Sequence, residues 1–202
     1  MQTQIVLTVI LNFRTPRMTL EAIAAAVREM EGIEGEIVVV ENGSGDESLK
    51  VLEAGIAEAG WRRVTLVASD RNGGFGAGNN IGIQHGLTDG RRPDFVFLLN
   101  SDAQPEPGAI GALLAHMEAH PEVGIAGSYL HGIEGDPHQS AFRFPTIAGE
   151  FEGAARTGAI TRLFKHAVIP FEITDEAIPV DWVAGASVLF RREVLDEFDR
   201  LV

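Results

Sequence analysis

Short apolar runs recur along the chain and are separated by segments with helical periodicity. The first run, Ile5–Leu11, is rich in β-branched residues and is followed by Asn12, as in a strand buried on both faces. Further runs of this kind are Ile37–Val40, Val64–Val67 and Phe95–Leu99, and a short strand is expected near Gly124–Ser128. Strands that alternate with helices predict an α/β fold with a mostly parallel sheet flanked by helices.

The segments between the runs carry helix start signals. Thr15-Pro16 provides a cap and a first-turn proline, and apolar residues from Leu20 to Met30 follow at helical spacing. Asp46 is a candidate cap for a second helix that carries Leu49, Leu52 and Ile56. Helices are also expected over residues 106–119 and 192–201.

From residue 130 to 179 the periodicity weakens, and Gly, Pro, His and aromatic residues are scattered without a repeat. We interpret 130–179 as a lid or insertion within a single domain that spans residues 1–202. Regular structure is expected again over Val180–Phe190.

The net charge narrows the possible partners. The chain has 202 residues and a formal charge of −13, and its basic residues form no run longer than a pair. Nucleic acid would be repelled, so it is excluded as a general partner. A phosphate ligand would need a metal ion, local arginines or backbone N–H groups to offset this charge.

The chain has no cysteine, which excludes disulfides, zinc–thiolate sites and thiol catalysis. Its start, MQTQIVLTVILNF, lacks a basic segment and is too short and polar-flanked for a signal peptide or membrane span. We therefore expect a cytoplasmic location. Peripheral contact with the inner face of the membrane stays open.

Polar residues gather where the expected strands end: Asn12, Glu41-Asn42, Asn72 and Asn100-Ser101-Asp102. In parallel α/β sheets, ligands bind outside the carboxyl ends of the strands. This coincidence is the strongest functional indication that the residues give without reference to any family.

Two carboxylates stand out in this set. Asp102 follows the strand Phe95–Leu99, where its oxygen could bind Mg²⁺ or Mn²⁺, although an Asp/Asn turn after a strand is common. Glu41 could accept hydrogen bonds from a ribose or a base N–H. The alternative for the segment from Glu41 to Asp46 is a tight glycine turn with a helix cap.

The glycine-rich segment Arg71–Asn80 fits neither common phosphate motif. A dinucleotide fingerprint would need glycine where Asn79 or Ile81 stands, and the P-loop lysine would fall at Asn79. What remains is a loop whose backbone, at Asn72 and Gly74 among others, can approach a ligand and whose helix start favours anions. A purely structural turn is the alternative.

Two weaker signals complete the survey. His116 and His120 are four residues apart on an expected helix, but without an H-E-x-x-H pattern we interpret them as solvent-facing. The segment Asp181-Trp182-Val183-Ala184-Gly185-Ala186 places a tryptophan beside small residues. Such a ring could wall a sugar pocket or simply pack in the core.

Taken together, these segments resemble the inverting glycosyltransferases of GT-A family 2, particularly its rhamnosyltransferase-like members. The resemblance covers nearly the whole chain, and its order rather than any one piece makes it specific. It is carried by Val9–Phe13, Val38–Asp46, Asn72–Gly76, Asn79–Gly82, Leu98–Asp102 and Trp182–Ala186 with Phe190-Arg191-Arg192.

The resemblance implies a GT-A (Rossmann-like) fold and roles for individual residues. Asp102 matches the metal-binding aspartate of the D-x-D motif, whose first position is here Asn100. Glu41 would contact the base or ribose. The nucleotide-binding set would be Asn12, Glu41, Asn42, Asn72, Gly74, Asn79, Asn100 and Ser101, and the sugar or acceptor set Asp181, Trp182, Gly185 and Ala186.

The implied reaction is metal-dependent transfer of a sugar, with rhamnose a candidate, from a UDP- or dTDP-sugar to a saccharide or lipid-linked acceptor. The resemblance also places 130–179 on the acceptor side. The family's Glu-Asp pair, expected after Arg191-Arg192, has no counterpart before Val202, so we expect the catalytic segment to be missing and the catalytic base with it.

Two other classes compete with this interpretation. A domain that binds nucleotide-sugar without turnover fits the missing base. A sugar-1-phosphate nucleotidyltransferase would need a G-x-G-x-R loop after the first strand, where the sequence reads Asn12-Phe13-Arg14-Thr15-Pro16. An NAD-dependent enzyme ranks lower because the glycine register fails.

Overall fold

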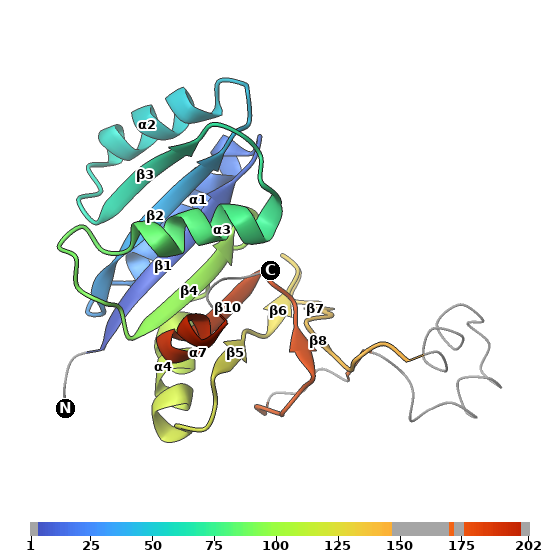
Figure 1. Ribbon diagram of the computed structural model, residues 1–202. Helices are drawn as coiled ribbons and strands as arrows, with labels where there is room; N and C mark the ends of the chain where they lie inside the picture. Colours follow the sequence, from blue (N-terminus) through green and yellow to red (C-terminus); the bar gives the residue numbers. More distant parts are fainter. Residues whose placement is uncertain (1–3, 147–169, 172–175, 199–202) are drawn as a thin grey trace, which may run out of the picture. The chain divides into compact units, whose positions relative to one another are not determined.

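The computed structural model describes residues 4–146, 170–171 and 176–198, and the chain divides into two compact units (Figure 1). The first comprises Met1–Ala126 with Gly185–Val202, and the second comprises Gly127–Ala184. The expectation of one domain with an insertion at 130–179 remains a proposal beside this division.

The first unit is built on a six-stranded sheet with the order β3-β2-β1-β4-β10-β5. Strands β1, β2, β3 and β4 are parallel, and β10 pairs antiparallel with β4. The α/β class and the mostly parallel sheet predicted from the sequence are confirmed. The strands are β1 (Ile5–Asn12), β2 (Glu34–Asn42), β3 (Val64–Ser69), β4 (Phe95–Asn100), β5 (Ile125–Gly127) and β10 (Ser187–Arg191).

The strand order reverses at β1. The chain runs outward from β1 to β2 and β3, then returns to place β4 on the other side of β1. The register pairs Asn12 with Glu41, and Leu11 with both Val40 and Asn100. The polar strand ends therefore lie along one edge, and the crevice between β1 and β4 is the topological switch point where such sheets bind ligands.

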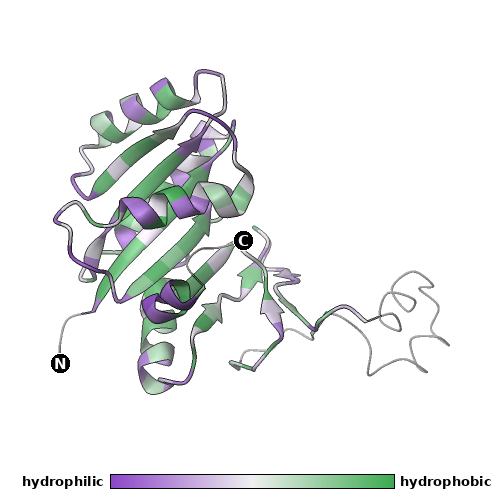
Figure 2. Cartoon of the chain, viewed as in Figure 1, coloured by the Kyte–Doolittle hydropathy of each residue, from purple (hydrophilic) through white to green (hydrophobic). Residues whose placement is uncertain are grey.

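Helices cover both faces of this sheet. Helices α1 (Pro16–Glu29), α2 (Ser48–Ala59) and α4 (Ala109–Ala119) contribute Ile23, Leu52 and Ile110 to one apolar cluster. Helices α3 (Gly74–His85) and α7 (Arg192–Glu197) contribute Ile83 and Leu195 to the other. The strands between them are apolar, as their green colour in Figure 2 shows, and their residues are buried on both sides of the sheet.

Several expected helix ends differ in detail. The fourth helix begins at Ala109 rather than at residue 106, and α2 begins at Ser48 with Glu47 as its N-cap. Asp46 still accepts a hydrogen bond from the Ser48 N–H at 2.9 Å. Thr15 caps α1 by position but makes no side-chain cap bond, because its hydroxyl is used elsewhere.

The second unit contains short strand pairs. β6 (Leu130–His131) pairs with β7 (Pro137–His138), and β8 (Ala141–Phe142) pairs with β9 (Trp182–Val183). Much of the segment predicted as an insertion, residues 147–169 and 172–175, lies outside the described residues. The expected regular structure over Val180–Phe190 is found as β9 and most of β10.

Candidate functional site

The loops that follow β1 and β4 are joined directly at the switch point. The hydroxyl groups of Thr15 and Ser101 lie 3.1 Å apart in a hydrogen bond. The Ala103 N–H also donates to the Asn100 carbonyl at 3.2 Å and tightens the turn that carries Asp102. The sheet thus holds the Asn100-Ser101-Asp102 segment against the start of α1.

Asn12 holds the loop after β1 in place. Its side chain is fully buried, donates to the Ser44 hydroxyl at 3.4 Å and accepts from the Thr19 hydroxyl at 2.8 Å. The Ser44 hydroxyl also accepts from the Arg14 N–H at 3.0 Å, and Arg14 has a left-handed φ of 59°. Asn12 therefore contributes to the edge by positioning the chain around it.

Glu41 is 5% exposed at the end of β2. Its Oε1 accepts the Ser44 N–H at 2.9 Å, which closes the turn that follows the strand. Its second oxygen, Oε2, has no hydrogen-bond partner among the residues that the structure describes. One carboxylate oxygen thus shapes the turn, and the other is available to a ligand.

Asn42 holds the glycine-rich loop in place. Its Nδ2 donates to the Asn72 Oδ1 at 3.0 Å and to the Gly74 carbonyl at 3.2 Å. Its Oδ1 accepts the Gly73 N–H at 3.3 Å, while the Asn72 Oδ1 also accepts the Gly74 N–H at 2.8 Å. The two asparagines therefore fix a loop whose glycine backbone stays exposed.

Close backbone contact explains the glycine after Asn42. Gly43 has a φ of 64°, and a Cβ atom added there would lie 2.3 Å from the Arg71 carbonyl carbon. Only glycine fits this conformation and this distance. The turn after β2 and the loop after β3 are consequently packed backbone to backbone.

Asn79 fixes the start of α3. It is 2% exposed and donates through Nδ2 to the Phe75 carbonyl at 3.0 Å. The ring of Phe75, by contrast, is 47% exposed. The buried asparagine therefore supports the backbone beneath an exposed aromatic side chain.

Asp102 is exposed, and Asn100 and Ser101 are partly buried beside it. These side chains offer hard oxygen ligands of the kind that Mg²⁺ and Mn²⁺ prefer. No group of three or more His, Asp or Glu side chains able to hold a metal is found among the described residues. A cation here would take most of its ligands from water and phosphate, as Mg²⁺ commonly does.

The predicted sugar and acceptor residues are divided between the two units. Gly185 and Ala186 belong to the first, where the Ala186 carbonyl accepts the Asn100 N–H at 2.9 Å. Asp181 and Trp182 belong to the second. Their contact with a sugar or acceptor remains a prediction.

Within the second unit, Trp182 forms an aromatic platform. Its ring stacks on Phe142 at 4.1 Å with a 12° angle between the planes, and its Nε1 donates to the Arg143 carbonyl at 3.1 Å. The side chain is nevertheless 41% exposed. The neighbouring Asp181 accepts the Phe144 N–H through Oδ2 at 2.9 Å.

Of the residues that join these loops, Ser101 was in the predicted site, whereas Thr15, Thr19 and Ser44 were not. Ser44 and Thr19 had no sequence signal of their own, and Thr15 was assigned only as a helix cap. Phe75 lay inside a recognised glycine-rich segment, but nothing in the pattern separated it from a core aromatic. The rings of His116 in α4 and of His120, which caps the end of this helix, have centroids 4.5 Å apart and planes tilted by 37°.

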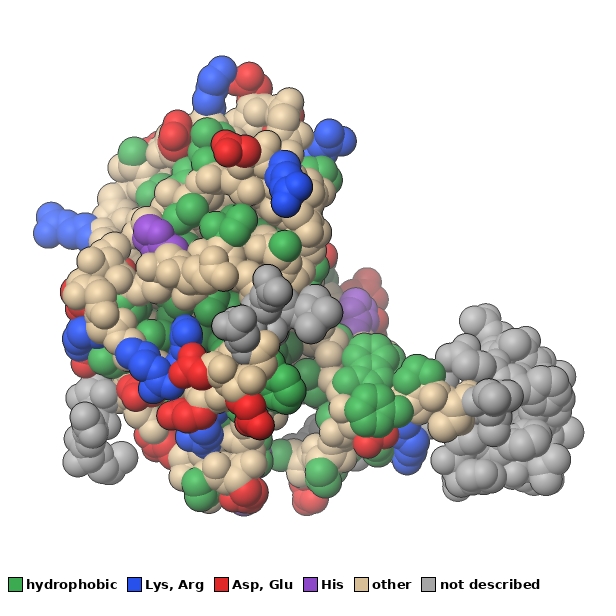
Figure 3. All heavy atoms as spheres, in the orientation of Figure 1, with side chains coloured by type: hydrophobic (Ala, Val, Ile, Leu, Met, Phe, Trp, Pro, Cys, Tyr) green, Lys and Arg blue, Asp and Glu red, His purple; other side chains and the backbone are tan. Residues whose placement is uncertain are grey.

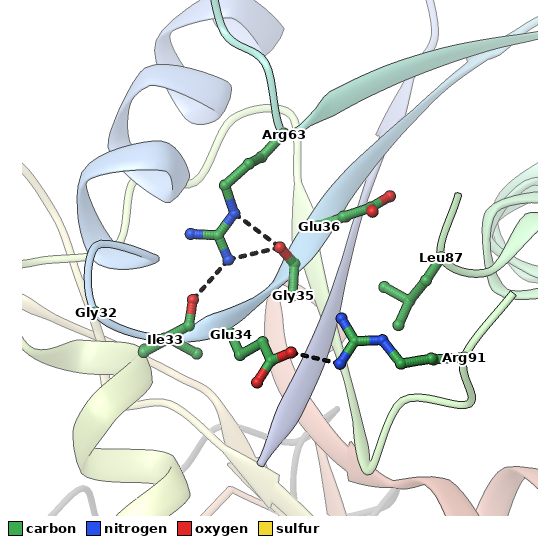
Figure 4. Close-up of a pocket in the computed structure, with 8 residues that line it drawn as sticks. All are labelled: Gly32, Ile33, Glu34, Gly35, Glu36, Arg63, Leu87 and Arg91. Atoms are coloured by element: carbon green, nitrogen blue, oxygen red, sulfur yellow. Dashed lines mark hydrogen bonds and ion pairs between the residues drawn. The ribbon is translucent and has the colours of Figure 1, made fainter. Parts of the chain in front are cut away.

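A pocket of about 480 Å³ lies at the opposite, amino-terminal edge of the sheet (Figure 4). Its charged groups are already paired. Arg63 donates to the carbonyls of Met30, Ile33 and Gly35, Arg91 pairs with Glu34 and Asp89, and Glu36 accepts from Thr88. Hydrogen bonds from Arg91 hold the pKa of Asp89 below its usual range. These bonds brace the strand starts and leave no charged group for a ligand.

Acidic and basic side chains also alternate around α7, as Figure 3 shows in red and blue. Asp196 pairs with Arg92 and accepts from the Arg192 Nε at 2.8 Å. Hydrogen bonds from Arg92 and then Arg192 lower the pKa of Asp196 below its usual range. A carboxylate held in this way is a poor general base.

The fold is an α/β sheet with polar groups at the carboxyl ends of its strands, beside the switch point where such sheets bind ligands. The sequence matches the family described as glycosyl transferase family 2 over residues 8–197. The chain belongs to this glycosyltransferase family. No curated protein sequence gives a significant match.

Solved glycosyltransferases share the fold. A mannosyltransferase from Pyrobaculum calidifontis, in complex with GDP-Man and Mn²⁺, is 16% identical with a TM-score of 0.61, over 96% of this chain and 46% of its own. TarS from S. aureus, in complex with UDP, is 14% identical with a TM-score of 0.59, over 96% of this chain and 48% of its own. Glucosyl-3-phosphoglycerate synthase from Mycobacterium tuberculosis, in complex with Mn²⁺, UDP and phosphoglyceric acid, is 14% identical with a TM-score of 0.55. The match covers 95% of this chain and 57% of that protein.

The chain spans about half the length of these solved structures. Along its described residues, no helix is both long and apolar enough to cross a membrane.

Proposed function

We propose that the carboxyl edge of the sheet binds a UDP- or dTDP-linked sugar together with a divalent cation, and that the protein containing it transfers the sugar to a saccharide or lipid-linked acceptor. The observation that carries this proposal is the joined pair of loops at the switch point. Thr15 and Ser101 tie them together 3.1 Å apart, and Asp102 stands exposed beside them.

The edge offers a separate group for each part of the donor. Glu41 has one oxygen free to accept from a base or ribose, next to the asparagine-braced loop of Asn72 and Gly74. Asp102, with Asn100 and Ser101, would hold Mg²⁺ or Mn²⁺, and the cation would neutralise charge on the departing diphosphate. Solved structures of the same fold that contain Mn²⁺ with GDP-Man or UDP support a nucleotide-linked donor bound together with a cation.

The reaction that follows from the family resemblance is one in-line displacement with inversion. The acceptor oxygen forms a bond to the anomeric carbon while the bond from that carbon to the diphosphate oxygen breaks. The electron pair leaves with the diphosphate, and the hydroxyl proton passes to a base. Assistance by such a base raises the reaction rate by about 10²–10⁴-fold. Rhamnose is our first candidate sugar because the motifs resemble the rhamnosyltransferase-like branch.

Calorimetric titration with UDP, dTDP and GDP, each with and without Mn²⁺, tests the binding part. We expect UDP or dTDP to bind in a Mn²⁺-dependent manner and GDP to bind less tightly. Equal binding with and without the cation would contradict the assignment of Asp102. A donor-hydrolysis assay on the same samples separates an active transferase from a domain that only binds nucleotide-sugar.

A further inference from the structure

Phe75 is an exposed aromatic residue on a braced backbone. Its side chain is 47% exposed although it lies in the first turn of α3, next to the fixed loop of Asn72 and Gly74. Burying a phenylalanine would stabilise the fold, so this position gives up part of that gain. The buried Asn79 meanwhile holds the Phe75 carbonyl at 3.0 Å. The backbone of Phe75 is thus fixed while its ring remains accessible.

The ring of Phe75 reaches the start of β10. A Cβ atom added to Gly185 would lie 3.2 Å from the Phe75 Cζ and 3.3 Å from its Cε1. The next residue, Ala186, accepts the hydrogen bond from the Asn100 N–H at 2.9 Å. Phe75 therefore lies against the segment that is bonded to the end of β4, one residue before Ser101 and two before Asp102.

The order of strands gives the direction of a bound donor. Across the sheet, β2 carries Glu41, β4 leads to Asp102, and β10 lies beyond β4. A donor with its nucleoside at Glu41 and its diphosphate at Asp102 would place its sugar toward the start of β10. That is where the ring of Phe75 meets Gly185.

We infer that Phe75 is a specificity-determining residue whose ring packs against the donor sugar and not against the nucleoside diphosphate. The inference rests on the proposed function, because it takes its direction from the roles of Glu41 and Asp102. Sugar rings have apolar C–H faces that pack well on aromatic side chains. Gly185 keeps this place open, since any side chain there would press on the ring of Phe75.

The test compares sugar-linked and sugar-free nucleotides in wild type, Phe75→Ala and Phe75→Tyr. The probes are UDP, UDP-glucose, dTDP and dTDP-rhamnose, each titrated with Mn²⁺ present. We expect Phe75→Ala to weaken the best-bound nucleotide-sugar by roughly 3- to 10-fold. Its affinity for the matching free diphosphate should stay within about twofold, and Phe75→Tyr should resemble wild type.

The outcomes separate this inference from the function on which it rests. Equal losses for the sugar-linked and the free diphosphate would make Phe75 part of the nucleotide loop and overturn the inference alone. No loss for either would also overturn it. If wild type binds none of the four probes, the proposed function fails together with the inference. Gly185→Ala, which displaces the ring without removing it, should change the sugar-linked affinity and spare the free diphosphate.

Discussion

The two edges of the central sheet carry similar polar residues but use them differently. At the amino-terminal edge, Arg91 forms an ion pair with Glu34, and Arg63 donates hydrogen bonds to backbone carbonyls. At the carboxyl edge, the side-chain amides of Asn12 and Asn42 also make hydrogen bonds within the protein.

The carboxyl edge differs in the groups that are left for a ligand. Asp102 and the ring of Phe75 are exposed there, and the Glu41 Oε2 makes no hydrogen bond to the described residues. A pocket of about 480 Å³ at the amino-terminal edge is therefore a poor guide to the site. Accessible groups on a braced backbone are a better guide than hollow volume.

The largest expected difference between the edges is in cation-dependent binding. Asp102→Ala should lower Mn²⁺-stimulated binding of UDP or dTDP by on the order of 100-fold or more, because the cation that this carboxylate would hold offsets the repulsion between the diphosphate and an acidic protein. Its melting temperature should hardly change, since the side chain is exposed. Calorimetric titration measures the first quantity and a thermal melt the second.

Asp89→Ala is the matched control for that experiment. Asp89 is also an exposed aspartate, but it lies at the amino-terminal edge and pairs with Arg91. Binding should be as in wild type. If Asp102→Ala kept its full Mn²⁺ dependence, or if Asp89→Ala lost it, the contrast between the edges would be wrong.

Next in size is the nucleoside end of the site. Glu41→Gln leaves one oxygen to accept the Ser44 N–H and replaces the other by a donor, which should cost roughly 1–3 kcal/mol of binding to UDP or dTDP. The measurement is the dissociation constant of the free nucleotide. Unchanged affinity would show that Glu41 serves only the turn after β2.

Two glycines in the same turn give a third contrast, this time in the stability of the fold. Gly43 and Gly45 both have left-handed backbones, with φ of 64° and 69°. A Cβ at Gly43 meets the Arg71 backbone at 2.3 Å, whereas at Gly45 it meets nothing within 4 Å. Both alanine variants should lose about 1 kcal/mol of unfolding free energy through backbone strain, and Gly43→Ala about 1–2 kcal/mol more through overpacking.

Urea denaturation of the two variants measures this difference, and nucleotide titration shows where it acts. Gly43→Ala should also weaken UDP or dTDP binding, because the loop after β3 must move away from the turn. Gly45→Ala should bind as wild type does. Two variants with equal stability would mean that the backbone contact between the loops yields easily.

The sequence predicted the sheet and its polar edge because both follow from local patterns. β-branched runs such as Ile5–Leu11 specify buried strands, and Asn12, Glu41 and Asn100 directly follow or end such strands. The residues that fasten the loops could not be found in this way. Ser44 joins Asn12 and Arg14, and Ser101 joins Thr15 across 86 positions, so these pairings depend on the tertiary fold.

For the same reason, the groups of the carboxyl edge that are left for a ligand were only partly predictable. Asp102 and Glu41 were recognised by their positions after strands and by the family resemblance. Asn12, Asn42 and Asn79 were assigned to a nucleotide; their side-chain amides make hydrogen bonds within the protein, and their contact with a nucleotide stays a prediction. Polar residues at a strand end indicate where a site lies, but not which side chains face the ligand.

The smallest effect should come from the ion pairs near α7, at the amino-terminal edge. Asp196 is exposed and pairs with Arg92 and Arg192, which lower its pKa from the ordinary value of 3.8. Because the folded-state pKa lies below the unfolded one, the stabilisation is present above pH 3.8 and is lost as the pH falls through the folded-state pKa. Asp196→Asn should therefore lower stability slightly at pH 7, and the gap to wild type should close below that pKa. Urea denaturation across this pH range at low salt measures the gap, while UDP or dTDP binding at pH 7 should be the same in both proteins. A gap that persists in acid would assign the loss to packing of α7, and a loss of nucleotide binding would place this cluster in the site, against the division between the two edges.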